Sequence, residues 1–190
     1  MSDDDFFPPI PPPPRHTPAP QPEWFGPSTA VLGRAVAIDP FVLGRTGEVA
    51  LVVEALRAYP NGVAFTLVAV GRAGHELRDL LGPHHGPPGV DPDDHLRFGV
   101  ELSDGRRAIE MPAWAQTGSA TPAGPVLRRG RGGGGGARYD LEYWLWPLPP
   151  RGPLTFACRW RGRGLAMSRH TISADPIVDA AAGARDVWED

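Results

Sequence analysis

Apolar and polar side chains alternate along several short segments of this chain, and the alternation predicts β-strands. The clearest case is the segment 139–146, because successive side chains of a strand point to opposite faces of its sheet. One predicted face carries Tyr139, Leu141, Tyr143 and Leu145. The other carries Asp140, Glu142, Trp144 and Trp146. We expect the first face to be interior and the two indoles of the second to look outward.

Further strands are predicted at 31–38, 48–59, 63–70, 96–102, 106–111, 154–160 and 164–173. The segment 48–59 is apolar on both faces, as central strands are, with Val49, Leu51 and Val53 on one face and Val52 and Leu56 on the other. Asn61-Gly62 favours a type I′ hairpin turn after it. Asp175-Pro176 predicts a helix start with Asp175 as the cap, and apolar residues continue to Trp188.

Seven or eight short strands separated by turns favour an all-β fold. We therefore predict a two-layer antiparallel β-sandwich, immunoglobulin-like in outline, with a short C-terminal α-helix. A single sheet with one helix packed on it is the alternative arrangement.

The composition of the chain indicates a proline-rich arm followed by a folded domain. Of its 190 residues 24 are proline and 24 are glycine, a proportion typical of turn-rich and low-complexity sequence. Residues 1–27 are rich in proline and predict a disordered arm that serves as a spacer, whereas 28–190 predict a single domain. Within that domain, 112–137 contain few apolar residues and a run of glycines, so we expect a flexible loop.

Charge and cysteine content restrict the possible functions. The formal net charge is −3 and every basic residue except histidine is arginine, so a surface built entirely for nucleic acid is not expected. The single cysteine, Cys158, falls on the apolar face of its predicted strand and is interpreted as a core residue. The first residues lack the basic and apolar regions of a signal peptide, and no apolar run reaches membrane-spanning length, which predicts a cytoplasmic protein without membrane contact.

Two alternative sites come from local residue clusters. His84, His85, Asp91 and His95 carry groups that bind divalent metals, although their spacing matches no known metal motif, and no cofactor is expected. They predict, as the alternative function, a metal-binding protein or a metal-assisted hydrolase. The tract Arg128-Arg129-Gly130-Arg131, with Arg159, Arg161 and Arg163 near an indole, suggests nucleic-acid binding. No nucleophile elbow or comparable catalytic motif favours an enzyme.

Three motifs carry a resemblance: Tyr-Trp-Leu-Trp-Pro-Leu-Pro-Pro at 143–150, Gly-Pro-Leu-Thr-Phe at 152–156, and Cys158-x-Trp160. With the Asp-Pro helix start, they resemble a group of small actinobacterial proteins of unknown function. The resemblance implies no activity, cofactor or catalytic residue.

The sequence therefore leads to a hypothesis of a non-enzymatic interaction module. Tryptophan is a frequent anchor of protein interfaces, and Trp144, Trp146 and Trp160 are the predicted interaction residues. The partner is an unidentified protein or a second copy of the chain. In the opposing interpretation, the same indoles are covered internally by the arm, the loop or the terminal helix.

Overall fold

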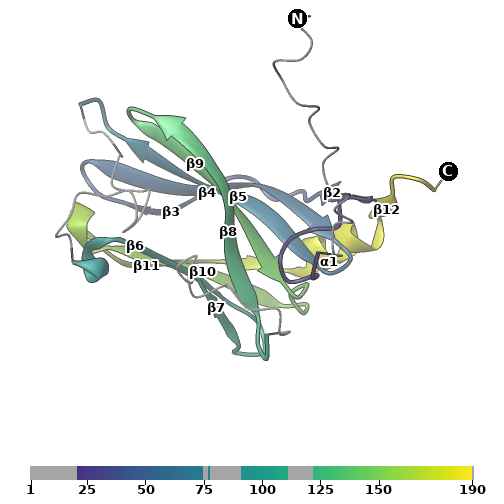
Figure 1. Cartoon of the computed structure of the whole chain (residues 1–190). Helices are drawn as coiled ribbons and strands as arrows, with labels where there is room; N and C mark the ends of the chain where they lie inside the picture. Colours follow the sequence, from purple (N-terminus) through teal and green to yellow (C-terminus); the bar gives the residue numbers. More distant parts are fainter. Residues whose placement is uncertain (1–20, 75–76, 78–90, 111–121, 190) are drawn as a thin grey trace, which may run out of the picture.

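The structure is a computed structural model that describes residues 21–74, 77, 91–110 and 122–189. Two β-sheets lie face to face and enclose an apolar core, as Figure 1 shows. The predicted all-β sandwich with a short helix near its end is thereby confirmed. Among the described residues, no helix combines the length and the apolar character needed to cross a membrane.

The first sheet has six strands and lies mainly in the upper part of Figure 1, and its edge strand β8 (Val126–Gly135) runs down beside β7 (Arg107–Ile109). Its members are β2 (Arg34–Ala35), β3 (Phe41–Arg45), β4 (Val49–Tyr59), β5 (Gly62–Gly71), β8 (Val126–Gly135) and β9 (Arg138–Trp146). The order is β2-β4-β5-β9-β8, and β3 pairs with a second stretch of β4. All of these pairings are antiparallel.

The second sheet lies below the first and has the order β11-β10-β6-β7. Its strands are β6 (Leu96–Glu101), β7 (Arg107–Ile109), β10 (Pro153–Trp160) and β11 (Leu165–Ser173). Two 3₁₀ turns, η3 (Pro92–Asp94) and η5 (Arg161–Arg163), lie beside each other at one end of this sheet. The strands β6 and β10 at its centre were both predicted, and their bounds agree closely with 96–102 and 154–160.

The two sheets meet along both edges, so the sandwich is nearly closed. On one side, the Ser168 hydroxyl of β11 donates a hydrogen bond of 2.6 Å to the carbonyl of Leu43 in β3. On the other side, Glu110 forms an isolated parallel bridge with Leu127 of β8. Contacts of this kind cover strand edges that would otherwise offer free hydrogen-bonding groups.

Alternation along β9 and β10 explains the core. The side of β9 that carries Tyr143 faces inward, as predicted, and its ring stacks on Phe65. From β10, Phe156 and Trp160 enter the same interior, with Cys158 between them. The interpretation of Cys158 as a core residue is therefore confirmed.

The strand β4 contains an irregularity that reverses its alternation. The pairing with β5 shifts register between Glu54 and Arg57, and Ala55 there has a positive φ of 56°. Because of this bulge, Leu56 faces the same interior as Val53, so the predicted assignment of Leu56 to the opposite face is wrong.

The hairpin after β4 also differs from its prediction. Tyr59 pairs with Gly62, so Pro60 and Asn61 form the turn, and the expected Asn61-Gly62 type I′ turn is wrong. Glycine is needed at position 62 for another reason. A Cβ there would lie 2.5 Å from the ring atom Cζ2 of Trp144. The glycine therefore makes room for an indole from the neighbouring strand.

The glycine-rich segment is largely a strand. Residues 126–135 of the predicted flexible loop 112–137 form β8, which pairs along β9 with a bulge between Arg129 and Gly132. Backbone hydrogen bonds hold this strand, and they need no apolar side chains. Residues 112–121 of that prediction, like residues 1–20 of the proline-rich arm, lie outside the described residues.

The predicted terminal helix is present but shorter than expected. It is α1 (Asp175–Ala182), and it lies against β4 and β2. Ala174 is its N-cap residue, so the prediction of Asp175 as cap is wrong; the Asp175 carboxylate instead accepts a hydrogen bond of 3.2 Å from the Gly152 amide. The chain then leaves the helix and forms β12 (Arg185–Asp186), which pairs with β1 (Val31–Leu32). The side chain of Trp188 is 85% exposed.

Candidate functional site

The predicted docking residue Trp144 is not available to a partner. It lies on the outer face of the six-stranded sheet, as alternation required, but its side chain is only 4% exposed. The segment 21–30 crosses it: the indole Nε1 donates a hydrogen bond of 3.1 Å to the Glu23 carbonyl, and the next residue of the segment, Trp24, is itself buried. Tyr59 packs edge-on against the same indole, with 5.6 Å between ring centroids. The prediction of Trp144 as an interaction residue is therefore wrong.

The other two predicted interaction residues, Trp146 and Trp160, differ in their exposure. Trp160 is 1% exposed and belongs to the core, so its assignment to an interaction surface is wrong as well. The reason is that Trp160 shares the inward face of β10 with Phe156. Trp146, at the end of β9, is partly exposed and remains a prediction.

Only part of the predicted metal cluster lies among the described residues. His84 and His85 lie outside the described residues, and His95 is buried. The Asp91 carboxylate accepts a hydrogen bond of 2.9 Å from the Asp93 amide, as expected of a turn. Within the described ranges, no three histidine, cysteine or acidic side chains gather in a way that could hold a metal ion.

The arginines of the Arg/Gly tract have structural contacts. Arg128 donates a hydrogen bond of 2.6 Å to the Phe25 carbonyl, and its guanidinium carbon lies 3.1 Å from the centre of the Phe25 ring. Arg129 forms an ion pair with Glu110, with 3.3 Å between Nε and Oε1. These two arginines attach the covering segment 21–30 and join the two sheets, so they are not free to form a nucleic-acid surface.

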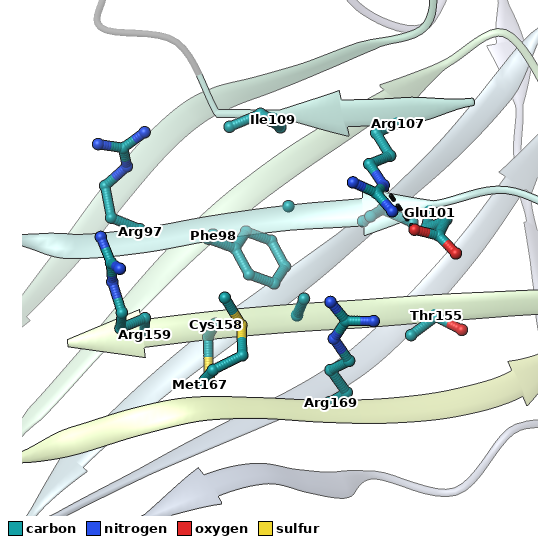
Figure 2. A pocket seen from close by; sticks show the side chains of 13 residues that line it. Arg97, Phe98, Glu101, Arg107, Ile109, Thr155, Cys158, Arg159, Met167 and Arg169 are labelled. Atoms are coloured by element: carbon teal, nitrogen blue, oxygen red, sulfur yellow. Dashed lines mark hydrogen bonds and ion pairs between the residues drawn. The ribbon is translucent and has the colours of Figure 1, made fainter. Parts of the chain in front are cut away.

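A groove of about 250 Å³ lies instead on the outer face of the four-stranded sheet, where no prediction placed a site. Figure 2 shows it from close by. Three outward-facing pairs join β6 and β10 beneath it: Arg97 with Arg159, Gly99 with Ala157, and Glu101 with Thr155. The middle pair has almost no side chain, so the floor of the groove is hollow and apolar.

Two exposed apolar side chains form the long walls of the groove. Ile109 of β7 is 50% exposed and lies opposite Gly99, and Met167 of β11 is 57% exposed on the other side. Gly99 keeps the floor open, and a Cβ there would make a tight contact of 3.2 Å with the Ala108 carbonyl oxygen. The result is an apolar trough across two small residues.

Four arginines border this trough. Arg97 and Arg159 lie at one end, Arg107 lies towards the other, and Arg169 rises from β11 beside the floor. Arg107 forms an ion pair of 2.6 Å with Glu101, which also lines the groove. In the described part of the chain, Arg169 has no carboxylate partner.

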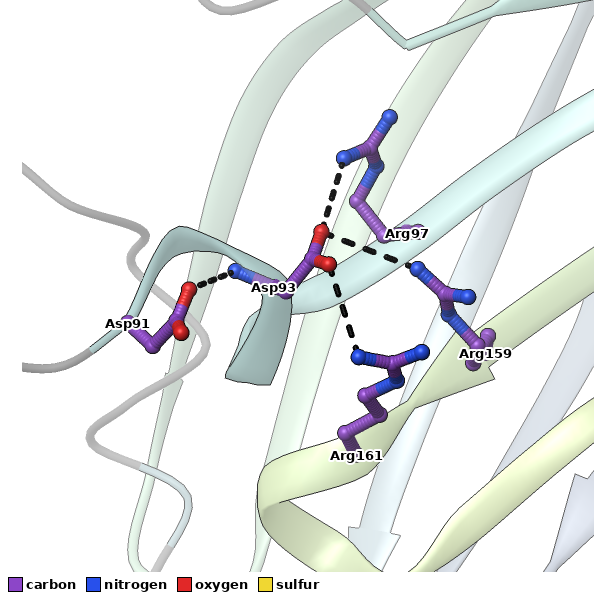
Figure 3. Close-up of polar contacts among 5 residues, drawn as sticks. All are labelled: Asp91, Asp93, Arg97, Arg159 and Arg161. Atoms are coloured by element: carbon purple, nitrogen blue, oxygen red, sulfur yellow. Dashed lines mark hydrogen bonds and ion pairs between the residues drawn. The ribbon is translucent and has the colours of Figure 1, made fainter.

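The end formed by Arg97 and Arg159 is unusual, because like charges on directly opposed strands destabilise a sheet. Figure 3 shows how Asp93 of η3 relieves this repulsion. Its carboxylate lies 3.6 Å from Arg97 and 3.7 Å from Arg159, and 3.5 Å from Arg161 as well. The single carboxylate of Asp93 thus lies near three guanidinium groups, and this end of the groove keeps an excess of positive charge.

Behind Ile109, a buried acid connects the groove to the core. The Tyr143 hydroxyl donates a hydrogen bond of 2.6 Å to Glu110, whose side chain is 15% exposed. Burial raises the pKa of the Glu110 carboxyl, while the charge of Arg129 and the bond from Tyr143 act in the opposite direction. Burial also raises the pKa of the Tyr143 hydroxyl well above its ordinary value of 10.0. This pair joins β7, one wall of the groove, to the six-stranded sheet.

The chemistry of the groove is that of binding. Arginine keeps its proton under all ordinary conditions, so the four arginines of the groove offer fixed positive charge. Cys158 lies directly beneath, but burial raises the pKa of its thiol to about 12, which leaves it a poor nucleophile. The arrangement suits an anionic ligand with an apolar part.

Neither the models of protein families nor the curated proteins compared with this chain match it. The resemblance of its tryptophan and proline motifs to a group of actinobacterial proteins therefore stays a prediction. Sequence reasoning missed the groove, although one signal was present: small residues occupy the centre of the polar face in both 96–101 and 154–160.

Proposed function

We propose that this chain is a protein-binding module, and that its arginine-bordered groove binds an acidic, partly apolar segment of a partner protein. The single observation that carries the proposal is the excess of positive charge around an exposed apolar floor. Four arginines and one glutamate line the groove of a chain whose formal net charge is −3. Elsewhere in the sequence acids therefore outnumber bases, and the positive charge is concentrated at this place.

An extended peptide fits this surface better than a globular face does. The trough runs between Ile109 and Met167 over a floor of two small residues, which leaves room for one or two apolar side chains. Arginines at the border can then bind carboxylates on either side, with two parallel hydrogen bonds each. Apolar burial supplies affinity, and the charges supply selectivity for acidic partners.

Nucleic acid shares the negative charge but has less support. Proteins that bind single strands stack bases on exposed aromatic rings. The aromatic residue that lines this groove, Phe98, is 2% exposed and points into the core. Exposed apolar walls such as Met167 suit peptide side chains better than phosphates.

The test uses fluorescent octapeptides of alternating aspartate and leucine, with lysine and leucine as the opposite-charge control. We expect the acidic peptide to bind the full chain and the basic one not to bind, as followed by fluorescence anisotropy. Affinity should fall in high salt, because exposed charges are screened over about 8 Å at physiological ionic strength.

Variants locate the binding. Arg169→Glu should weaken the acidic peptide at least tenfold, and Ala157→Leu should do the same by filling the floor. Arg72→Glu is the matched control, because it makes the same charge change at an exposed position outside the groove. Equal affinity in the Arg169 and Arg72 variants would refute the proposal, and so would stronger binding of an oligonucleotide than of the peptide.

A further inference from the structure

The chain itself contains a segment with the chemistry that the groove requires. Asp3, Asp4 and Asp5 form the one run of three consecutive acids in the sequence, and Phe6, Phe7 and Ile10 follow at once. We infer that the natural occupant of the groove is the segment Asp3–Ile10 of a second copy of this chain, an inference that rests on the proposed function.

The charge and the polarity of the segment complement those of the groove. The aspartates carry three negative charges, and the groove is bordered by four arginines of which Asp93 and Glu101 offset only part. The adjoining phenylalanines are the large apolar side chains that a floor of Gly99 and Ala157 can accommodate. Acidic and apolar groups thus lie next to each other in the segment, as the arginines and the trough do in the groove.

The fold favours a second copy over the chain's own segment. Glu23 is held on the outer face of the six-stranded sheet by the hydrogen bond from Trp144, and Phe25 is held there by Arg128. The groove opens on the outer face of the other sheet, on the far side of the sandwich. A segment that starts from one face would have to pass around an edge of the sandwich to reach its own groove. Another molecule can present the segment directly.

Reciprocal exchange would produce a symmetric dimer. If each copy places its segment in the groove of the other, both contacts form at once, and the second is intramolecular. The proline-rich residues between Ile10 and Glu23 act as the spacer in this arrangement. The dimer thus combines two weak sites into a more stable association.

The experiment measures association of the full chain by sedimentation equilibrium. The wild type should dimerise, and the variant with Asp3, Asp4 and Asp5 changed to Asn should dissociate at least tenfold more readily. Arg169→Glu should do the same, whereas Arg72→Glu should behave as wild type. A mixture of the asparagine variant with the Arg169 variant should form a heterodimer, because one intact segment then meets one intact groove.

The outcomes separate this inference from the proposed function. A wild type that stays monomeric, or a dimer unaffected by either variant, overturns the inference. Tight binding of the aspartate and leucine octapeptide to the same protein would then leave the proposed function standing. If the inference holds, the asparagine variant should bind that octapeptide more tightly than the wild type does, because its groove has lost its natural competitor. Failure of the octapeptide to bind even that variant overturns both.

Discussion

Removal of one hydroxyl group, by Tyr143→Phe, tests whether the buried acid Glu110 joins the two sheets. The hydroxyl donates to Glu110 at 2.6 Å, and Tyr143 is only 2% exposed, so water cannot replace the bond. A hydrogen bond to a charged acceptor contributes about 1.5–3 kcal/mol to stability. We therefore expect a loss of about 2 kcal/mol, or about 4–8 °C in Tm for a chain of this size.

The buried Glu110 also makes the stability of the wild type depend on pH. Burial raises the folded-state pKa of Glu110 above its ordinary value of 4.5, so the folded protein binds a proton more readily than the unfolded chain does. The free energy of unfolding of the wild type should fall as pH rises from about 4.5 through that pKa, by at most about 1.4 kcal/mol per pH unit. Glu110→Gln should remove this slope.

Chemical denaturation at pH 4 and pH 8 measures the free energy of unfolding of the wild type and of the Tyr143→Phe variant. The cost of Tyr143→Phe should be about 2 kcal/mol at pH 8, and about 1 kcal/mol at pH 4, where Glu110 is protonated and accepts only a neutral bond. Tyr139→Phe is the control, since Tyr139 is on the same strand and has no hydroxyl bond among the described residues. Equal costs for the two tyrosines, or a cost that does not change with pH, would refute the reasoning.

Three further variants or probes test other features of the fold. Trp144→Ala should lower the free energy of unfolding, measured by urea denaturation, by about 3–5 kcal/mol, because the indole is buried beneath residues 21–30. Trp188→Ala should lower it by less than about 0.5 kcal/mol, because that side chain is exposed. Similar losses for the two variants would contradict the burial of Trp144. Ala55→Gly should leave stability unchanged or raise it by up to about 1 kcal/mol, since φ is positive there, while Ala50→Gly in the same strand should lower it by about 1 kcal/mol. Alkylation of Cys158 at pH 8, followed by mass spectrometry, should require unfolding, because its pKa is about 12; rapid modification of the native protein would show an accessible thiolate.

Local alternation predicted the strands well but not what covers them. The inward face of β9, with Tyr143, and that of β10, with Cys158, were correct because side-chain direction depends only on position along a strand. The exposure of Trp144 was wrong because its cover comes from Glu23, 121 residues away in sequence. The end of α1 was misplaced for a similar reason, since the residues after it pair with β1.

The groove was beyond sequence reasoning because it depends on register. Gly99 and Ala157 form its floor only because β6 and β10 pair so that these residues oppose each other. A slip of one residue would point every outward side chain to the other face. The charge of the border also depends on η3, which places Asp93 among arginines from two strands. Neither the register of β6 and β10 nor the position of Asp93 can be inferred from the spacing of residues in the sequence.

A map of where an acidic segment binds tests directly whether the groove on the four-stranded sheet is the binding site. A peptide of residues 1–12 is titrated into isotope-labelled full-length protein with Asp3, Asp4 and Asp5 changed to Asn, and backbone amide shifts are followed by NMR. We expect the largest changes on β6 and β10 around Gly99 and Ala157, and we expect Arg169→Glu to abolish them. Changes concentrated on residues 21–30 or around Trp188, or no saturable changes at all, would contradict it.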